Sequence, residues 1–203
     1  MKLAKKENLA IVPRGAGTGL SGGSIARKGG IILAFARMNK ILEIDLENER
    51  AVVQPGVVNL DLTKAVEAHG FYFAPDPSSQ KACTIGGNVA ENSGGPHTLA
   101  NGVTVNHITG LEVVMPDGRI VELGGKSTDH PGFDLTGFFV GSEGTLGIAT
   151  KITVKLSRTP EATATLLVIY NTVDDAAKTV VALTGACITP AALELLDGWT
   201  LRA

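Results

Sequence analysis

The order of apolar and polar positions in the first part of the chain predicts strands rather than helices. Short apolar runs at residues 9–12 and 31–35 are typical of buried strands, and a stretch rich in glycine lies between them. Two more apolar runs, at 41–46 and 51–54, are separated only by the polar residues 47–50. That spacing predicts a β-hairpin.

The next segment has the periodicity of an amphipathic helix. Apolar positions recur there at i, i+3, i+4 and i+7, which places them on one face. The positions that share this face are Leu62, Ala65, Val66 and His69. Asn59 is the expected N-cap and Gly70 the expected C′ residue, because asparagine caps free N–H groups and glycine tolerates the left-handed conformation that ends helices. We therefore expect a helix with one buried face.

The middle of the chain predicts a long irregular stretch followed by a second hairpin. Residues 74–102 show little periodicity, with only a short helix expected around Asn88. An irregular stretch of that length in a compact domain is usually functional. Apolar runs at 111–115 and 119–123 flank a Pro-Asp-Gly turn, and alternation at 152–156 predicts a further strand.

The last part of the chain predicts a boundary and then a strand and a helix. Pro160 marks the boundary, residues 164–170 have the pattern of a strand, and residues 172–184 have that of a helix. Thr172 begins a capping-box pattern, and Gly185 is the expected stop signal.

Composition excludes several classes of function. The chain is 44% hydrophobic, enough for a sizeable core, and its formal net charge of −2 gives no broad attraction to nucleic acid or anionic lipid. No apolar stretch reaches membrane-spanning length, so we expect a cytoplasmic protein that meets a membrane only through a partner. Cys83 and Cys187 are too few for a disulfide framework or a metal site, and we expect both to be small buried residues.

Glycine is the unusual residue type, and its clustering points to backbone-mediated binding. The chain has 25 glycines in 203 residues, well above the usual share of about 7%. The first glycine loop, residues 13–23, reads Pro-Arg-Gly-Ala-Gly-Thr-Gly-Leu-Ser-Gly-Gly. Without Cβ atoms, consecutive N–H groups can converge on a pyrophosphate, and Arg14 can add a charge-assisted bond. The alternative is a flexible solvent loop.

This loop contains the pattern of dinucleotide-binding Rossmann folds but not its context. Residues 17–22 match G-x-G-x-x-G. A Rossmann site needs a helix that begins on those glycines, whereas here a strand is predicted from residue 31. No Gly-Lys-Ser or Gly-Lys-Thr follows, which also excludes a nucleoside-triphosphate loop.

Two further glycine-rich segments offer different chemistry. The second glycine segment, residues 84–95, combines glycines with asparagine side chains, which suit the alternating carbonyl and N–H groups of a flavin pyrimidine edge. Two tight turns around a helix would explain it equally simply. The third glycine loop, residues 141–148, brings Glu143 close to a possible ribose hydroxyl, and its alternative is a hairpin turn with bulge glycines.

In this order, and with Pro-Asp-Pro-Ser-Ser at residues 75–79 between the first and second, the glycine segments resemble the FAD-binding domain of the vanillyl-alcohol oxidase/p-cresol methylhydroxylase (PCMH-type) superfamily. The branch that looks most similar holds the glycolate oxidase FAD subunit and D-lactate dehydrogenase, and the matching motifs lie within residues 8–158. The resemblance implies an α+β fold of two subdomains with FAD between them. It also implies an FAD-binding domain over residues 1–160, with its first strand and helix incomplete, and the start of a substrate domain over 161–203, most of which is missing.

The resemblance also implies a set of cofactor-binding positions. They are Arg14, Gly15, Ala16, Gly17, Thr18, Gly19, Leu20, Ser21, Pro75, Asp76, Ser78, Ile85, Gly86, Gly87, Asn88, Asn92, Ser93, Gly94, Gly102, Thr104, Glu143, Gly144 and Ile148. Thr18 stands where covalently flavinylated relatives carry histidine, so non-covalent FAD is implied. Asn101 stands where the family usually has tyrosine. The packing that a tyrosine ring would supply beside the cofactor is therefore not implied for this chain.

The activity implied by the resemblance is oxidation of a 2-hydroxy acid, of the glycolate or D-lactate type, to the 2-keto acid. The flavin would carry the redox step. The implied partners are FAD, the acid, and a partner chain or a second copy. Two alternatives stay open: a non-catalytic FAD-binding module or half of a split flavoenzyme, and another reaction on this fold, such as the reductase of cell-wall amino-sugar synthesis.

No histidine is a convincing catalytic base. His69 falls on the predicted apolar helix face, while His107 and His130 stand singly in predicted loops. Only His97, which follows the second glycine segment, is expected near the flavin, and a structural role is favoured for it. The catalytic residues are thus unassigned, and no metal site is expected.

Overall fold

The strands form one five-stranded sheet and two two-stranded sheets in the computed structural model, which describes residues 1–127 and 132–202. In chain order the elements are α1 (Lys2–Lys6), β1 (Ile11–Arg14), β2 (Ile31–Ala34), β3 (Ile41–Asp45), β4 (Arg50–Val53), α2 (Asn59–Val66), the 3₁₀ helix η1 (Glu67–His69), β5 (Phe71–Tyr72), α3 (Ile85–Glu91), α4 (Thr98–Asn101), the 3₁₀ helix η2 (Thr104–His107), β6 (Ile108–Val114), β7 (Ile120–Gly124), α5 (Leu135–Phe139), β8 (Ile148–Lys155), β9 (Ser157–Arg158), α6 (Val173–Gly185) and the 3₁₀ helix η3 (Thr200–Arg202). His130 lies outside the described residues.

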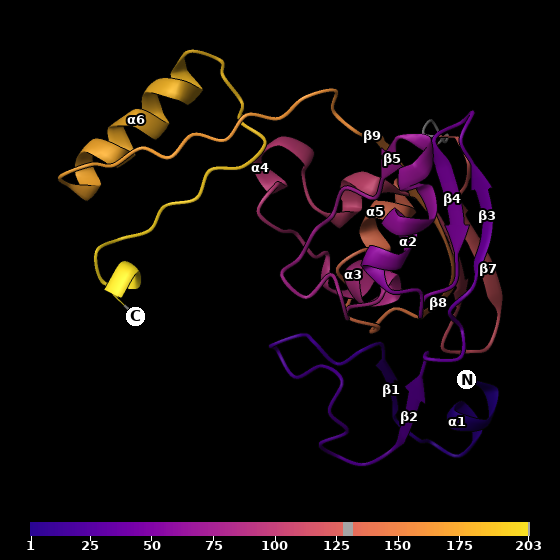
Figure 1. Cartoon of the computed structure of the whole chain (residues 1–203). Coiled ribbons are helices and arrows are strands. Elements are labelled where there is room, and N and C mark those ends of the chain that lie inside the picture. The colour runs from indigo at the N-terminus through magenta and orange to yellow at the C-terminus, as the bar shows by residue number, and fades with distance from the viewer. Residues whose placement is uncertain (128–131, 203) are drawn as a thin grey trace.

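The five-stranded sheet supplies one side of the core. Its order is β3-β4-β8-β6-β7, and every pairing is antiparallel. Helices α2, α3 and α5 lie on one face (Figure 1) and bury Leu62, Ile85 and Phe139 against it. Ile152 and Val154 on the central strand β8 are completely buried, as the period-two alternation predicted. The predicted α+β fold is confirmed.

The N-terminal part forms a separate small unit at one end of this body. Strands β1 and β2 pair in parallel, and α1 lies beside them (Figure 1). The first strand runs over Ile11–Arg14 rather than the predicted 9–12. The strand therefore includes Pro13. Proline has no N–H to donate, but it is tolerated here because β1 is an edge strand that pairs only with β2 among the described strands.

Both predicted hairpins are confirmed, but the first helix differs in detail. Asn59 is the first helical residue rather than the N-cap, and its buried amide donates to the Pro75 carbonyl at 2.8 Å. The last turn tightens to 3₁₀ geometry, which rotates His69 off the apolar face, and Ala65 is also exposed. Gly70 ends the helix with a φ of 77°, as predicted.

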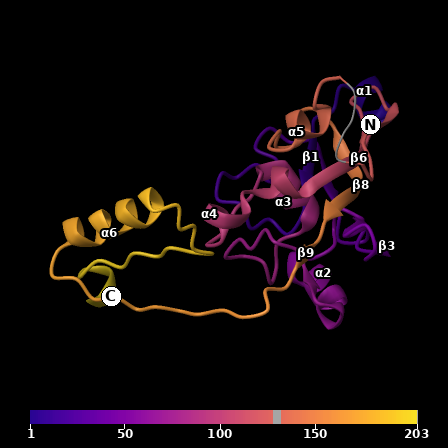
Figure 2. The same ribbon diagram turned by 90° about the horizontal axis from the view of Figure 1, so that it is seen from above.

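Residues after Thr159 extend away from the sheet (Figures 1 and 2). The predicted strand over 164–170 is wrong: the side chains of residues 166–169 are 58–89% exposed and no described strand pairs with them. Helix α6 is confirmed, and Thr172 Oγ1 accepts from the Asp175 N–H at 3.2 Å. Gly185 is its last residue rather than its stop signal, since Cys187 adopts the positive φ, and Cys187 is exposed rather than buried.

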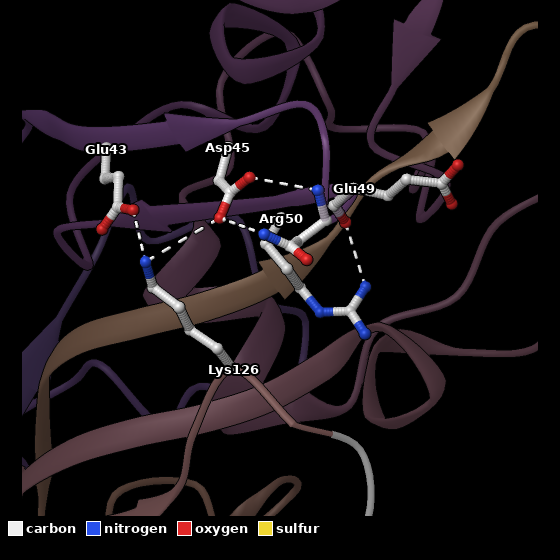
Figure 3. A network of polar contacts seen from close by, with 6 residues as sticks. Glu43, Asp45, Glu49, Arg50 and Lys126 are labelled. Atoms are coloured by element: carbon white, nitrogen blue, oxygen red, sulfur yellow. Dashed lines mark hydrogen bonds and ion pairs between the residues drawn. The ribbon is translucent and has the colours of Figure 1, made fainter.

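A charged network links the two edge strands of the large sheet (Figure 3). The Lys126 ammonium, just beyond β7, pairs with Glu43 on β3 and lies 3.9 Å from Asp45. Hydrogen bonds from Asn48 hold the pKa of the Asp45 carboxyl below its usual value, and the bond to Glu43 raises the pKa of Lys126. Because Lys126 and Glu43 are exposed, the contribution of their ion pair to the free energy of unfolding is small.

Candidate functional site

A cavity of ≈ 280 Å³ opens between the small N-terminal unit and the larger body. One wall is the first glycine loop with Phe35 at the end of β2. The opposite wall is formed by α3 and by the segment that leads from α5 into β8. Residues from three distant parts of the chain therefore meet at one cavity.

The cavity gathers many of the positions that the resemblance implied. Those that line it are Arg14, Gly15, Ala16, Gly17, Thr18, Gly19, Leu20, Gly86, Gly87, Asn88, Ser93, Glu143, Gly144 and Ile148. Those that do not line it are Ser21, Pro75, Asp76, Ser78, Ile85, Asn92, Gly94, Gly102 and Thr104.

The first glycine loop lines the cavity and has backbone donors without acceptors in the described chain. Among the described residues, none accepts a hydrogen bond from the N–H groups of residues 15–23. Gly17 has a φ of +74°, and a Cβ atom placed on it would lie 3.2 Å from the Arg14 guanidinium. The loop thus combines unpaired N–H groups with a cation against the same backbone, the arrangement that binds phosphate oxygens.

The second glycine segment uses its N–H groups internally. The Gly86 N–H donates to the Pro55 carbonyl at 2.8 Å, and the Gly87 N–H donates to Thr84 Oγ1 at 3.2 Å. A Cβ atom on Gly86 would lie 2.5 Å from the Pro55 Cβ. Glycine in this segment therefore permits close packing of the backbone. The short helix predicted around Asn88 is confirmed as α3.

Asn88 is a buried polar residue of this segment at the cavity. Its side chain is 1% exposed, it lines the cavity, and its Nδ2 has no hydrogen-bond partner among the described residues. A buried donor without a partner costs about 1–3 kcal/mol.

The third glycine loop is anchored to α3 rather than folded as a hairpin turn. The N–H groups of Gly141 and Glu143 donate to the carbonyls of Val89 and Ala90 at 2.8 and 2.9 Å. Glu143 has a φ of 52°, in the left-handed region that few non-glycine residues adopt. These bonds place Glu143 beside Glu91, which also lines the cavity.

Glu91 is a cavity residue that the glycine pattern did not identify. The available signal was helical periodicity, because Glu91 lies three residues after Asn88 and therefore on the same side of α3. Phe35, Pro55 and Cys83 also line the cavity without having been predicted. Burial raises the pKa of the Cys83 thiol, so Cys83 is a packing residue and not a reactive one.

Several predicted positions support the cavity from behind. Ile85 is completely buried in the core. Asn92 ends α3 with a φ of 51°, and its Oδ1 accepts from the Val105 N–H at 2.9 Å. Thr104 is buried, and its hydroxyl donates to the Ser93 carbonyl at 2.7 Å. These bonds hold the chain on either side of Ser93 in place.

None of the histidines among the described residues lines the cavity. His97 Nδ1 is 2.5 Å from Asp76 Oδ2, in an exposed pair that does not line the cavity. His107 is buried in η2 rather than lying in a loop, and its Nε2 is 2.8 Å from the Asn101 carbonyl.

In the parts of the chain that the structure describes, no group of three acidic, histidine or cysteine side chains could hold a metal ion. No helix among residues 1–127 and 132–202 is long and apolar enough to cross a membrane.

Comparison with known proteins agrees with this geometry. Glycolate oxidase subunit GlcD of Bacillus subtilis is 52% identical over 99% of this chain, and D-lactate dehydrogenase of Anaerostipes hadrus is 37% identical over 97%. The chain spans 43% and 42% of their lengths. A solved structure of alkyldihydroxyacetonephosphate synthase matches with a TM-score of 0.78 and 25% identity, over 94% of this chain and 35% of that one.

The chemistry of the cavity fits FAD. Free N–H groups and the Arg14 guanidinium suit the pyrophosphate. The FAD binding domain family matches residues 1–124. The chain therefore belongs to the FAD binding domain family, and FAD is its cofactor.

Proposed function

We propose that this chain is the FAD-binding part of an enzyme that oxidises a 2-hydroxy acid to the 2-keto acid. The observation that carries the proposal is the 52% identity with a glycolate oxidase subunit over 99% of the chain. A second relative is a D-lactate dehydrogenase, and glycolate and D-lactate are both 2-hydroxy acids. The shared chemistry is therefore loss of hydrogen from a carbon next to a carboxylate.

The chain's own residues bind and orient the cofactor. Bound FAD supplies the two-electron acceptor. The first glycine loop and Arg14 would hold the pyrophosphate, and Asn88 would lie beside the cofactor in the cavity wall. Together these contacts fix the position of the flavin relative to the larger body, which is the protein's main contribution in flavin enzymes.

We propose that the group that accepts the substrate's proton lies outside the residues that line the cavity. Among the described residues that line the cavity there is no histidine or lysine. We propose that residues 1–160 form the FAD-binding domain, that residues 161–203 begin a substrate domain, and that the remaining groups come from further sequence or from a partner chain. This agrees with the relative's name, which describes one subunit of glycolate oxidase. A cytoplasmic location, with any membrane attachment through that partner, belongs to the same proposal.

We also propose that FAD is held without a covalent bond. Thr18 lines the cavity where a flavinylated relative would carry histidine, and a threonine hydroxyl does not form that link. Acid precipitation of the FAD-loaded protein should release all the yellow colour into the supernatant. Colour retained in the pellet would contradict this part of the proposal.

The activity is tested by anaerobic reduction. The FAD-loaded chain, alone and co-purified with its partner chain, is mixed with glycolate or D-lactate, with a 3-hydroxy acid as control, and the visible flavin absorbance is followed. We expect bleaching by a 2-hydroxy acid in the complex, and FAD binding without bleaching in the chain alone.

Three outcomes would count against the proposal. Rapid bleaching of the chain alone would show that a complete site lies within these residues. An FAD-loaded complex that no 2-hydroxy acid bleaches would favour a non-catalytic FAD module. Bleaching by NADPH instead would favour the reductase alternative.

A further inference from the structure

We propose that His97 and Asp76 are positioning residues whose ion pair joins two segments of the chain beside the FAD cavity. The two segments are the Pro-Asp-Pro turn at residues 75–77 and the stretch at residues 93–97 that follows α3. The resemblance implied that Asp76 binds the cofactor, but neither side chain of the pair lines the cavity. Their effect on FAD is therefore indirect. The inference rests on FAD binding and not on oxidation of a hydroxy acid.

The pair is close and has no competing partner. Nδ1 of His97 lies 2.5 Å from Oδ2 of Asp76, and with a proton on Nδ1 the imidazole donates to the carboxylate. Among the described residues, no other carboxylate forms an ion pair with His97, and no other basic side chain forms one with Asp76. The Asp76 side chain is only 19% exposed. Solvent therefore screens this pair less than it screens pairs on the open surface.

The Pro-Asp-Pro turn is held to the larger body independently of His97. The buried amide of Asn59, at the start of α2, donates to the Pro75 carbonyl at 2.8 Å. The Gln80 N–H donates to the Pro77 carbonyl at 2.8 Å. The proline after Asp76 also restricts the backbone of Asp76 to extended conformations. The turn thus holds the carboxylate of Asp76 in a fixed place.

The stretch at residues 93–97 packs directly against this turn. A Cβ atom on Gly95 would lie 2.2 Å from the carbonyl oxygen of Asp76 and 2.4 Å from its Oδ1. The Thr98 hydroxyl accepts from the Gly95 N–H at 2.7 Å and donates to the Gly95 carbonyl at 2.6 Å. Among the described residues, the bond between His97 and Asp76 is the one hydrogen bond that links the stretch to the turn. The ion pair therefore decides whether the two stay together.

Both segments continue into the cavity wall. Ser79, three residues after Asp76, and Ser93, four residues before His97, both line the cavity. The N–H and hydroxyl of Thr104 donate to the Ser93 carbonyl at 3.0 and 2.7 Å, which holds Ser93 from one side. The ion pair holds the same stretch from the other side. Without it, residues 94–97 are free to move in the empty protein and must be ordered when FAD binds, which costs affinity.

The test measures FAD affinity and does not depend on turnover, so failure of the proposed oxidation is seen separately. Dissociation constants for FAD are measured for the unmodified chain, His97→Gln, Asp76→Asn and the variant that carries both changes. The matched control is His69→Gln, because His69 is an exposed histidine on η1, outside the cavity and without an ion pair among the described residues. Chemical denaturation without FAD shows that each variant is folded.

We expect each single change to weaken FAD binding about fivefold, from the cost of ordering a loosened stretch of chain. The double variant should bind FAD as well as either single variant, within about twofold, because both changes break the same bond. His69→Gln should stay within about twofold of the unmodified chain.

Three results would overturn the proposal. A loss of affinity in the double variant equal to the product of the two single losses would show that each side chain contacts the cofactor by itself. Unchanged FAD affinity in His97→Gln and Asp76→Asn, with a lower free energy of unfolding, would show that the pair has a structural role only. Failure of the unmodified chain to bind FAD is the third. If Asp76→Asn does not fold, His97→Gln decides alone, because the exposed side chain of His97 tolerates the change.

Discussion

The first and second glycine segments have similar compositions but use glycine for different physical purposes. In residues 15–23 the backbone N–H groups find no acceptor within the described chain, so they are available to a ligand. In residues 84–95 the donors of Ile85, Gly86 and Gly87 are all satisfied internally. Glycine there lets backbones approach, as where Gly95 meets Asp76. A count of hydrogen bonds separates a binding loop from a packing loop, and glycine content does not.

The largest effect on stability should come from the packing segment. A Cβ atom on Gly95 would lie 2.2 Å from the Asp76 carbonyl oxygen, so Gly95→Ala should cost about 3 kcal/mol of unfolding free energy. The matched change Gly19→Ala meets only the end of Glu91 at 3.4 Å and should leave stability nearly unchanged. Chemical denaturation of both variants without FAD measures the difference. If Gly95→Ala and Gly19→Ala were equally stable, the two segments would not differ in their use of glycine for packing.

The next largest effect should be on FAD affinity. Gly17→Val fills the space beside Arg14 and the free N–H groups, so FAD binding should fall by about 100-fold or more while the protein stays folded. A branched residue at positive φ also costs about 1–2 kcal/mol of stability. Gly29→Val is the control, because Gly29 has the same sign of φ but no neighbour within 4 Å and lies outside the cavity. If Gly17→Val retained full flavin content, the loop would not be part of the site.

A smaller effect, with opposite signs for stability and binding, is expected at Asn88. Asn88→Leu removes a buried donor that has no partner, so the unfolding free energy without FAD should stay equal or rise. The affinity for FAD should fall by about tenfold, corresponding to a loss of about 1.4 kcal/mol. Titration with FAD and denaturation without it give the two numbers. A variant that loses stability and keeps its affinity would show that Asn88 is a core residue only.

The smallest expected effect is a pH dependence of stability at His107. Burial lowers the pKa of His107 below its usual value of 6.5. The unfolded chain then binds a proton in a range where the folded chain does not, so stability falls as the pH drops below about 6.5 and levels off below the folded pKa. His107→Gln should flatten this part of the stability curve, whereas His69→Gln at an exposed position should not. If the dependence of stability on pH were unchanged in His107→Gln, a group other than His107 would be its cause.

Local pattern was enough to predict most of the fold. Both hairpins, the short helix at Asn88 and the cap at Thr172 depend on neighbouring residues, and all are present. The strand expected at 164–170 is absent because a strand needs a pairing neighbour, and no described strand provides one. His69 was misplaced because the change from α to 3₁₀ geometry is not visible in the periodicity.

The site was predicted less completely than the fold, for a related reason. The glycine loops could be found because a binding backbone needs glycine. The position of Glu91 depends on bonds between the third glycine loop and the end of α3, which are about 50 residues apart along the chain. No local pattern distinguishes Asn88, which faces the cavity, from Asn59, which bonds to Pro75.

Backbone hydrogen exchange with and without FAD compares the two glycine segments directly. The N–H groups of residues 15–23 should exchange fast in the free protein and become protected when FAD binds, because the phosphates supply the acceptors that the chain does not. The N–H groups of residues 85–88 should already be protected and change little. Bound FAD with unchanged exchange at residues 15–23 would contradict the assignment of the first glycine loop to the cofactor.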